Sequence, residues 1–194
     1  MDDVQRVVSQ QEIYELSCRY MRGLDRLDRA LLMSVFTEDA YCEYGFINGT
    51  PTEFVDYAIN ALTSHVANHH MIGNHLIEFE GEEAFGEIYF NAYHKVETDE
   101  GPQDIVIAGR YLDRYTRSDE GWKMAYRSER VDWSRTQATC DPYFAGAPKS
   151  LLGARSTDAV YRTDNRCWPI PKSMKSRWHK LFGIPTGRRF PDGN

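Results

Sequence analysis

The first third of the chain repeats apolar positions with the period of an α-helix. Four apolar side chains recur every three or four residues, at Ile13, Leu16, Tyr20 and Leu24. This spacing places them along one face of a helix. The capping-box pattern Ser9-Gln10-Gln11-Glu12 predicts where the helix begins, and Gly23 is placed to end it. Two further helices are expected after Asp28 and Thr52.

From about residue 69 the period changes to the two-residue alternation of β-strands. Stretches rich in Ile, Val, Tyr and Phe predict strands at residues 69–80, 84–97, 103–117 and 122–134, after a shorter strand at residues 40–44. Turn signals separate the long strands at Gly81, Gly101 and Gly121. Helices followed by a meander of long strands predict an α+β fold. We expect a cone-shaped α+β barrel, in which N-terminal helices pack in a curved, mainly antiparallel sheet around a blind cavity.

The end of the chain has a different character. Six prolines and little periodicity follow Asp141. We therefore expect one domain over residues 1–140 and an irregular extension over residues 141–194. The extension is too rich in Trp, Tyr, Phe and Arg to be simply disordered. We expect it to pack on the body, cover the mouth of the pocket or reach a neighbouring subunit.

Composition and charge narrow the possible partners. The net charge of −6 provides no basic surface for nucleic acid. No apolar run approaches the length of a membrane span, and the polar start is unlike a signal peptide. The four cysteines lack a Cys-x-x-Cys spacing, which is typical of free thiols in a cytoplasmic protein. Aromatic residues reach 13%, and so many rings either over-fill the core or line an apolar cavity. A small hydrophobic or aromatic molecule is the expected partner.

Asp25 and the pair His69-His70 are the first candidates for chemistry. They are too far apart in sequence for a local surface pair, so they can meet only across the fold. A carboxylate beside an imidazole can hold the ring as a general base. Successive strand residues point to opposite faces, so only one of the two histidines can face the interior. The simpler alternatives are a half-buried sheet histidine and a solvated loop acid.

Tyr20 and Arg127 are candidates for assisting a leaving group. Tyr20 continues the apolar face of the first helix, so core packing is the simpler role. It converges with Asp25 only if the helix breaks at Gly23, and its phenol would then donate to a leaving hydroxyl. Arg127 lies on the last strand, opposite in face to Met124. An exposed strand arginine is an equal alternative, whereas an inward guanidinium could stabilise negative charge on a leaving oxygen.

No pattern calls for a metal or an organic cofactor. Several histidines cluster in sequence, at His65, His69, His70 and His75, but they do not have the spacing of a helical metal site. The sequence lacks a glycine-rich phosphate loop and a dinucleotide fingerprint. We therefore expect chemistry without a cofactor.

The chain resembles the SnoaL-like branch of the nuclear transport factor 2 superfamily over roughly residues 5 to 135. The resemblance is carried by RYMRGLD at residues 19–25, FTEDA at 36–40, NHHMIGN at 68–74, and GRYLDRY at 109–115 followed by GWK at 121–123. It implies the conical α+β fold. This superfamily hosts dehydratases, dehydrochlorinases, isomerases, dioxygenase small subunits and non-catalytic binding proteins. Association into dimers or trimers is also expected from the resemblance.

The resemblance also assigns roles to residues. Tyr20, Asp25 and His70 are similar to the Tyr, Asp and His of bile-acid dehydratases, which selects His70 over His69. Asp25, His70 and Arg127 are similar to the dyad and arginine of hexachlorocyclohexane dehydrochlorinase. Ala92 stands where the bile-acid enzymes place a further Asp, which argues against a steroid substrate.

Seven further residues are expected to line the substrate pocket. Strand alternation places His94 on the same face as Phe90, and the position of Tyr111 lines the pocket in the dehydrochlorinase that the chain resembles. The full set of expected pocket residues is Tyr41, Tyr44, Phe90, His94, Arg110, Tyr111 and Trp133.

These features together predict a cofactor-independent lyase that acts on a hydrophobic aromatic or polycyclic alcohol. His70, supported by Asp25, would move the proton, while Tyr20 and Arg127 would assist departure of the leaving group. Some members of the superfamily remove water and then formaldehyde from lignin-derived diarylpropane diols, and the same dyad could serve both steps. The alternative is a non-catalytic binding or structural protein, such as the small subunit of a ring-hydroxylating dioxygenase.

Overall fold

The computed structural model describes residues 1–150, 152–155 and 157–161. For Phe144, Ala145 and Ala159 it describes the backbone and not the side chain. It divides into two compact units, Met1–Ser156 and Thr157–Asn194. In the first unit, helices precede a six-stranded sheet, which confirms the predicted α+β class. The described part of the second unit holds one short 3₁₀ helix, Ala159–Tyr161. Most of the expected extension at residues 141–194 therefore lies outside the described residues.

Helix α1 (Asp3–Arg26) is longer than the sequence pattern predicts. Asp2 caps it and forms the capping box with Gln5, so the expected start at residues 9–12 is wrong. The helix also continues through Gly23 and ends at Leu27, whose φ of 54° is left-handed. Gly23 has a packing role instead, because a Cβ there would lie 2.6 Å from Cγ of Leu32.

Two shorter helices follow as predicted. Asp28 caps α2 (Arg29–Ser34) by accepting a hydrogen bond from the backbone N–H of Leu31. Helix α3 (Pro51–Thr63) begins with Thr50 and Glu53 in a capping box and proline in its first turn. Both helices begin where short polar side chains satisfy exposed backbone N–H groups.

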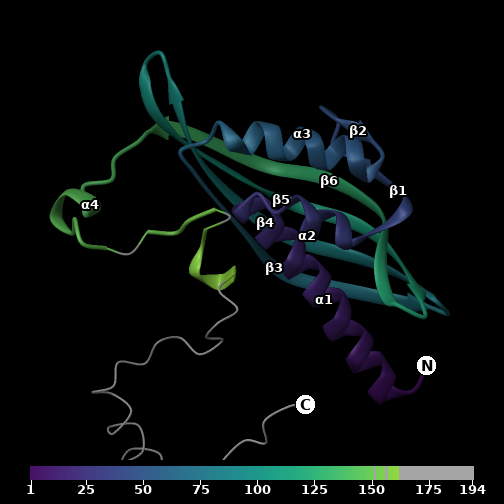
Figure 1. The fold of residues 1–194 in the computed structure, drawn as a ribbon. Helices are drawn as coiled ribbons and strands as arrows, with labels where there is room; N and C mark the ends of the chain where they lie inside the picture. Colours follow the sequence, from purple (N-terminus) through teal and green to yellow (C-terminus); the bar gives the residue numbers. More distant parts are fainter. Residues whose placement is uncertain (151, 156, 162–194) are drawn as a thin grey trace, which may run out of the picture. The chain divides into compact units, whose positions relative to one another are not determined.

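The sheet has the strand order β2-β1-β6-β5-β4-β3 (Figure 1). The strands are β1 (Phe36–Glu43), β2 (Asn48–Gly49), β3 (Ala67–Glu80), β4 (Glu83–Thr98), β5 (Gly101–Ser118) and β6 (Gly121–Ala138). Pairing is antiparallel except between β1 and β6, so the sheet is mixed and open rather than a closed barrel. The four long strands and their glycine turns are confirmed, and Gly81, Gly101 and Gly121 all have positive φ.

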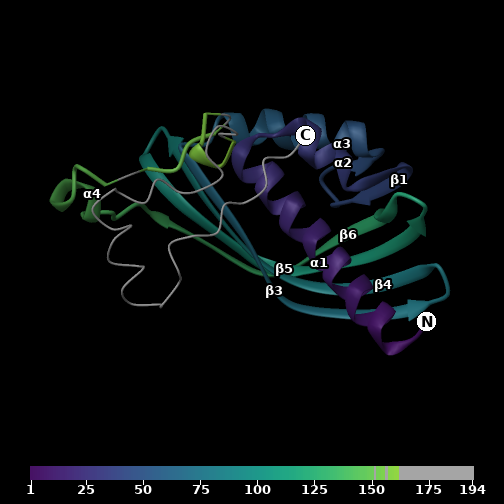
Figure 2. The same cartoon turned by 60° about the horizontal axis from the view of Figure 1, so that its bottom comes forward.

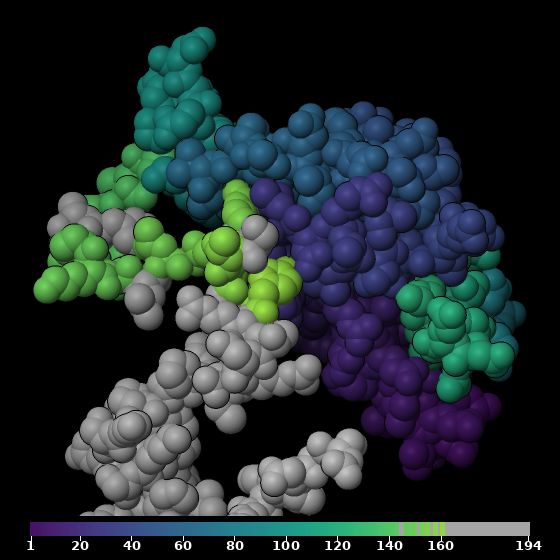
Figure 3. All heavy atoms as spheres, viewed as in Figure 1, coloured from purple at the N-terminus to yellow at the C-terminus, as the bar shows by residue number. Residues whose placement is uncertain are grey.

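Helix α1 crosses the concave side of the curved sheet, with α3 beside it (Figure 2). The space-filling view shows α1, α2 and α3, in purple and blue, lying together over this side (Figure 3). One apolar core lies between these helices and the sheet, and it includes Ile13, Leu32, Val55, Ile88 and Met124. The C-terminal end of α1 meets the start of β3, where Asp25 contacts His70.

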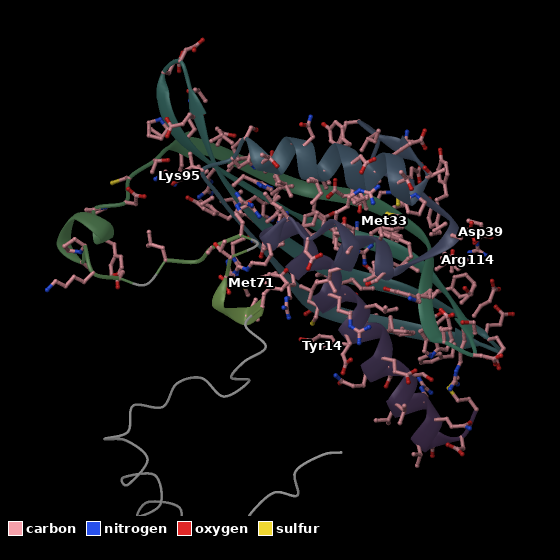
Figure 4. All side chains as sticks on the ribbon, viewed as in Figure 1. Tyr14, Met33, Asp39, Met71, Lys95 and Arg114 are labelled. Atoms are coloured by element: carbon pink, nitrogen blue, oxygen red, sulfur yellow. The ribbon has the colours of Figure 1, made fainter. Side chains whose placement is uncertain are left out.

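Beyond β6 the chain turns into α4 (Tyr143–Gly146). Lys95 of β4, labelled in Figure 4, forms an ion pair with Asp141, with Nζ 2.7 Å from Oδ2. None of the helices in the described part of the chain is long and apolar enough to cross a membrane.

Candidate active site

Asp25 and His70 meet where the end of α1 reaches the start of β3. The ring Nδ1 of His70 lies 2.8 Å from Oδ1 of Asp25, and the backbone N–H of His70 donates to both carboxylate oxygens at 3.1 and 3.2 Å. The two side chains are only 7% and 10% exposed. The Nδ1–H of the ring is thus bound by a carboxylate, which leaves Nε2 as the acceptor nitrogen.

Strand alternation separates the two neighbouring histidines as predicted. His70 is directed toward Asp25, whereas His69 is exposed. Met71, labelled on β3 in Figure 4, is likewise exposed, with 57% of its surface accessible. The two flanking residues therefore lie on the outside of the sheet while His70 lies inside.

The carboxylate of Asp25 receives one more hydrogen bond. Asn68 donates from Nδ2 to Oδ1 at 2.9 Å. Burial by itself would raise the pKa of Asp25, but the hydrogen bonds and charge of His70, together with the amide of Asn68, lower that pKa below its usual value. Asn68 was not predicted from the sequence, although it lies two residues before His70 and hence on the same strand face.

Two other histidine rings pack around the dyad. The ring of His94 lies 5.1 Å from that of His70 and 5.0 Å from that of His65, in edge-to-face contacts. Burial, followed by the charges of His70 and His65, lowers the pKa of His94 to about 3, so its ring is neutral. Among the described residues, Nδ1 of His94 and of His65 have no hydrogen-bond partner. His94 therefore lies buried beside His70.

This histidine cluster is no metal centre. In the part of the chain that the structure describes, no group of three His, Cys, Asp or Glu side chains has an arrangement that could hold a metal ion.

Arg127 is completely buried and paired. Its Nε and Nη2 donate to the two carboxylate oxygens of Asp113 at 2.8 and 2.6 Å, and both side chains are 0% exposed. The guanidinium also lies over the rings of Tyr20 and Tyr111, 4.3 and 4.1 Å from their centroids. Nη1 has no hydrogen-bond partner among the described residues. A cationic N–H is thus directed into the interior, where the described part of the chain provides no acceptor.

The expected opposition of Arg127 and Met124 is wrong. Tyr115 pairs with Met124 while Arg114 pairs with Tyr126, so Ala125 is an extra residue in β6. This β-bulge interrupts the alternation and brings both Met124 and Arg127 to the buried side.

Tyr20 does not join Asp25. The helix does not break at Gly23, and the hydroxyl of Tyr20 is 2.5 Å from that of Tyr44. Burial is the main cause that raises the pKa of Tyr20 far above its usual value, so the phenol is neutral and can act only as a hydrogen-bond donor or acceptor.

The expected aromatic pocket residues Tyr44, Phe90 and Tyr111 are all interior. Phe90 stacks on Tyr111 with centroids 4.5 Å apart, and Tyr44 stacks on Phe54 at 4.3 Å. These rings pack against one another on the inner side of the sheet, and such stacked aromatic pairs are stabilising. Two hollows lie elsewhere, one lined by Met1, Arg6, Glu78, Phe79 and Gly81, the other by residues 146–150.

Three expected pocket residues lie away from the site. Tyr41 and Trp133 are 48% and 50% exposed. Tyr41 points outward because its neighbours Ala40 and Cys42 are buried. Arg110 is next to the buried Tyr111 and therefore on the opposite face, where it binds Glu87 and Asp132 at 3.0 Å. The prediction that these three residues line the interior is wrong.

Glu129 was not identified from the sequence. It pairs across the strands with Tyr111 and so shares its inner face. Burial raises the pKa of Glu129 to about 7, despite the opposing charge of Arg127. Its position two residues after Arg127 on an unbroken part of β6 is the signal that could have revealed it. Glu129 is thus a carboxyl group on this inner face that holds a proton near neutral pH.

Comparison with known proteins agrees with this fold. The chain is 26% identical to the uncharacterized protein Rv2910c of Mycobacterium tuberculosis over 66% of this chain and 89% of that protein. It has the fold of hexachlorocyclohexane dehydrochlorinase LinA-type3 from Novosphingobium barchaimii, with 24% identity, a TM-score of 0.64, and coverage of 72% of this chain and 97% of the other. A scytalone dehydratase-like protein from Novosphingobium aromaticivorans matches at 21% identity and a TM-score of 0.61, over 70% and 91% of the two chains.

The family itself is defined by a match to the SnoaL-like domain at residues 5–128. This span contains all six strands up to the middle of β6, together with Asp25, His70 and Arg127. The resemblance of the four sequence stretches is confirmed, and the chain belongs to the SnoaL-like family.

Proposed function

We propose that the protein is a cofactor-independent lyase in which the Asp25–His70 dyad moves protons during an elimination. The supporting observation is the 2.8 Å contact between Oδ1 of Asp25 and Nδ1 of His70, whose side chains are almost completely buried. Asp25 keeps the proton of the neutral ring on Nδ1, so Nε2 accepts a proton from substrate. The carboxylate then stabilises the imidazolium that forms.

Arg127 and Glu129 would assist the leaving group, which needs a positive charge and a proton. When the C–O bond breaks, negative charge develops on the leaving oxygen. The unpartnered Nη1 of Arg127 supplies a fixed cationic donor for that charge. Glu129, protonated near neutral pH, supplies the proton that turns hydroxide into water. The hydroxyl of Tyr20 is bound to that of Tyr44, and the guanidinium of Arg127 lies over the ring of Tyr20. Tyr20 therefore acts on the leaving oxygen only through Arg127.

The surroundings of His70 favour an aromatic alcohol as substrate. His70 pairs across the strands with Ala92, and Ala92 pairs with Ile107 of β5, so small and apolar side chains share its inner face. Phe90 and Tyr111 follow on the same side. A flat ring is the ligand shape that this face accommodates best.

The proposed substrate class is a lignin-derived 1,2-diarylpropane-1,3-diol whose benzylic alcohol carbon carries a 4-hydroxyphenyl ring. Loss of water begins as His70 takes the phenol proton and the benzylic C–O bond breaks, which gives a quinone methide. Glu129, ionised by the first step, then takes the hydroxymethyl proton as the adjacent C–C bond breaks and releases formaldehyde. The electron pair of that bond forms the new C=C bond and restores the aromatic ring as a phenolate, to which His70 returns its proton. The net reaction converts the diol into a stilbene, water and formaldehyde.

The test is turnover of a panel of aromatic diols and polycyclic alcohols, followed by stilbene absorbance and formaldehyde release. We expect His70→Gln to lower turnover about 10²–10⁴-fold, the usual contribution of a general base. His69→Gln is the matched control, because it changes the neighbouring exposed ring and should leave turnover unchanged.

Equal activity of His70→Gln and the wild type would contradict the proposal. Substrates that raise the melting temperature of both proteins equally, without any turnover, would instead identify a binding protein. Water loss without formaldehyde release would limit the activity to dehydration.

A further inference from the structure

A short segment after the sheet returns to the dyad. Residues Leu152–Arg155, here called the strap, lie against the end of α1. Arg26 donates from Nη1 to the carbonyl oxygen of Ala154 at 2.8 Å. A Cβ added at Gly153 would lie only 3.4 Å from the same guanidinium nitrogen, so glycine makes room for this close approach.

Arg155 makes the contacts that reach the site. Its Nη1 donates to Oδ1 of Asn68 at 2.6 Å and to the backbone oxygen of Asp25 at 3.4 Å. Its Nη2 donates to the backbone oxygens of Leu62 and His65 at 3.4 and 3.3 Å. One guanidinium thereby joins the end of α1, the residues that end α3 and the start of β3.

These contacts fix the direction of the Asn68 amide. A guanidinium can only donate hydrogen bonds, so the amide oxygen must face Arg155. The amide NH₂ must then face the other neighbour, the carboxylate of Asp25, which can only accept when ionised. Oδ1 of Asp25 accordingly receives donors from both Asn68 and the His70 ring. Without Arg155, rotation of the amide by half a turn would present its oxygen to the carboxylate.

We propose that Arg155 is a positioning residue for the Asp25–His70 dyad, acting through the amide of Asn68. This inference rests on the proposed function for its catalytic consequence, but its structural content is independent of turnover. Arg155 lies beyond residues 5–128 that match the SnoaL-like domain. The strap therefore lies outside the matched family domain and contacts a site that lies within it.

The experiment compares Arg155→Gln, Asn68→Ala and the double variant with the wild type. ¹³C NMR follows the titration of the Asp25 carboxyl group, and ¹⁵N NMR reports which nitrogen of His70 carries the proton. We expect Arg155→Gln to raise the pKa of Asp25 and to mix the two tautomers of His70. Asn68→Ala should do the same, and the double variant should add little, because both residues act through one hydrogen bond.

Activity provides the second measurement. Loss of one hydrogen bond to a charged group should lower kcat about tenfold in Arg155→Gln, with KM little changed. Arg155→Lys preserves the charge but replaces the forked donor, so it should retain the fold and still lose kcat. Lys95→Gln is the matched control, since it breaks the ion pair with Asp141 at the base of the same extension and should change neither kcat nor the NMR signals.

Two results would overturn the inference. One is an unchanged Asp25 titration and His70 tautomer in Arg155→Gln and Arg155→Lys, with both proteins folded. The other is an effect of Arg155→Gln that adds fully to that of Asn68→Ala. Failure of the lyase proposal would look different, because wild-type turnover would be absent while the NMR comparison would still give its answer.

Discussion

The carboxylate of Asp25 binds His70 twice, through the ring Nδ1 at 2.8 Å and through the backbone N–H of the same residue. The second contact ties the carboxylate to the strand itself. The acid is thus fixed relative to the β3 backbone, and the ring rotates only about its own side-chain bonds. This double attachment explains how a helix end and a strand can hold a proton-transfer pair in one geometry.

Asp25→Asn should change the tautomer of His70. The asparagine amide offers one acceptor in place of two, so it cannot serve Asn68, the His70 backbone and the His70 ring together. We expect ¹⁵N NMR to show the proton moving toward Nε2 and turnover to fall about 10²–10⁴-fold. Asp28→Asn is the control, because asparagine caps α2 as well as aspartate does. An unchanged His70 spectrum in Asp25→Asn would refute this account.

Asp113→Asn should strongly destabilise the fold. It leaves the guanidinium of Arg127, which is 0% exposed, without its counter-charge. Breaking a buried ion pair in this way costs about 3–5 kcal/mol. Urea denaturation would measure the loss, and Asp113→Leu combined with Arg127→Met should recover much of it.

Glu83→Gln is the comparison for this measurement. It breaks the ion pair between Glu83 and Arg114, labelled in Figure 4, whose side chains are 44% and 46% exposed. An exposed pair contributes about 0–1 kcal/mol. A similar small loss in Asp113→Asn would mean that water reaches Arg127.

Gly23→Ala should destabilise the protein although alanine favours helix formation. The gain in helix propensity is about 1 kcal/mol, whereas the new Cβ would lie 2.6 Å from Cγ of Leu32 and force the two helices apart. We expect a net loss of about 1–2 kcal/mol by urea denaturation. Gly73→Ala should be nearly neutral, since a Cβ there meets Tyr89 at an ordinary 3.8 Å. Greater stability in Gly23→Ala would show that Gly23 has no packing role.

Glu129→Gln should alter how stability depends on pH. The pKa of Glu129 is about 7 in the folded protein, above its ordinary value of 4.5. Between these values the folded state holds more protons than the unfolded state, so the free energy of unfolding falls as pH rises from about 4.5 to 7. The variant lacks this loss and should become more stable relative to the wild type as pH rises. Parallel pH profiles of the two denaturation midpoints would contradict the assignment.

The strands and the dyad histidine could be predicted because they depend on local patterns. Alternation and positive-φ glycines define the hairpins, and alternation together with the family resemblance selects His70. The role of Gly23 could not be predicted, because it depends on the approach of Leu32 from another helix and no local pattern indicates that contact. The face of Arg127 was misjudged because one extra residue, Ala125, shifts the register of β6.

The roles of Asn68, Glu129 and Arg155 could not be predicted from the sequence, for a similar reason. Asn68 and Glu129 lie on faces that alternation identifies, but polar residues on a strand are usually solvated, so the pattern alone gives them no role. Arg155 lies in a stretch without periodicity. Its relation to Asp25 depends on where the chain returns after β6, which is a property of the tertiary fold.

The parallel pairing of β1 with β6 has a consequence for how the chain acquires this fold. Cys42 pairs with Arg127, so a strand formed early in the sequence finds its long neighbour only when the last hairpin is in place. Such non-local contacts carry a high entropic cost of loop closure and slow the rate-limiting step of folding. During synthesis, β1 therefore waits with an unpaired edge until β6 has left the ribosome. The buried cation is consequently among the last groups to be enclosed.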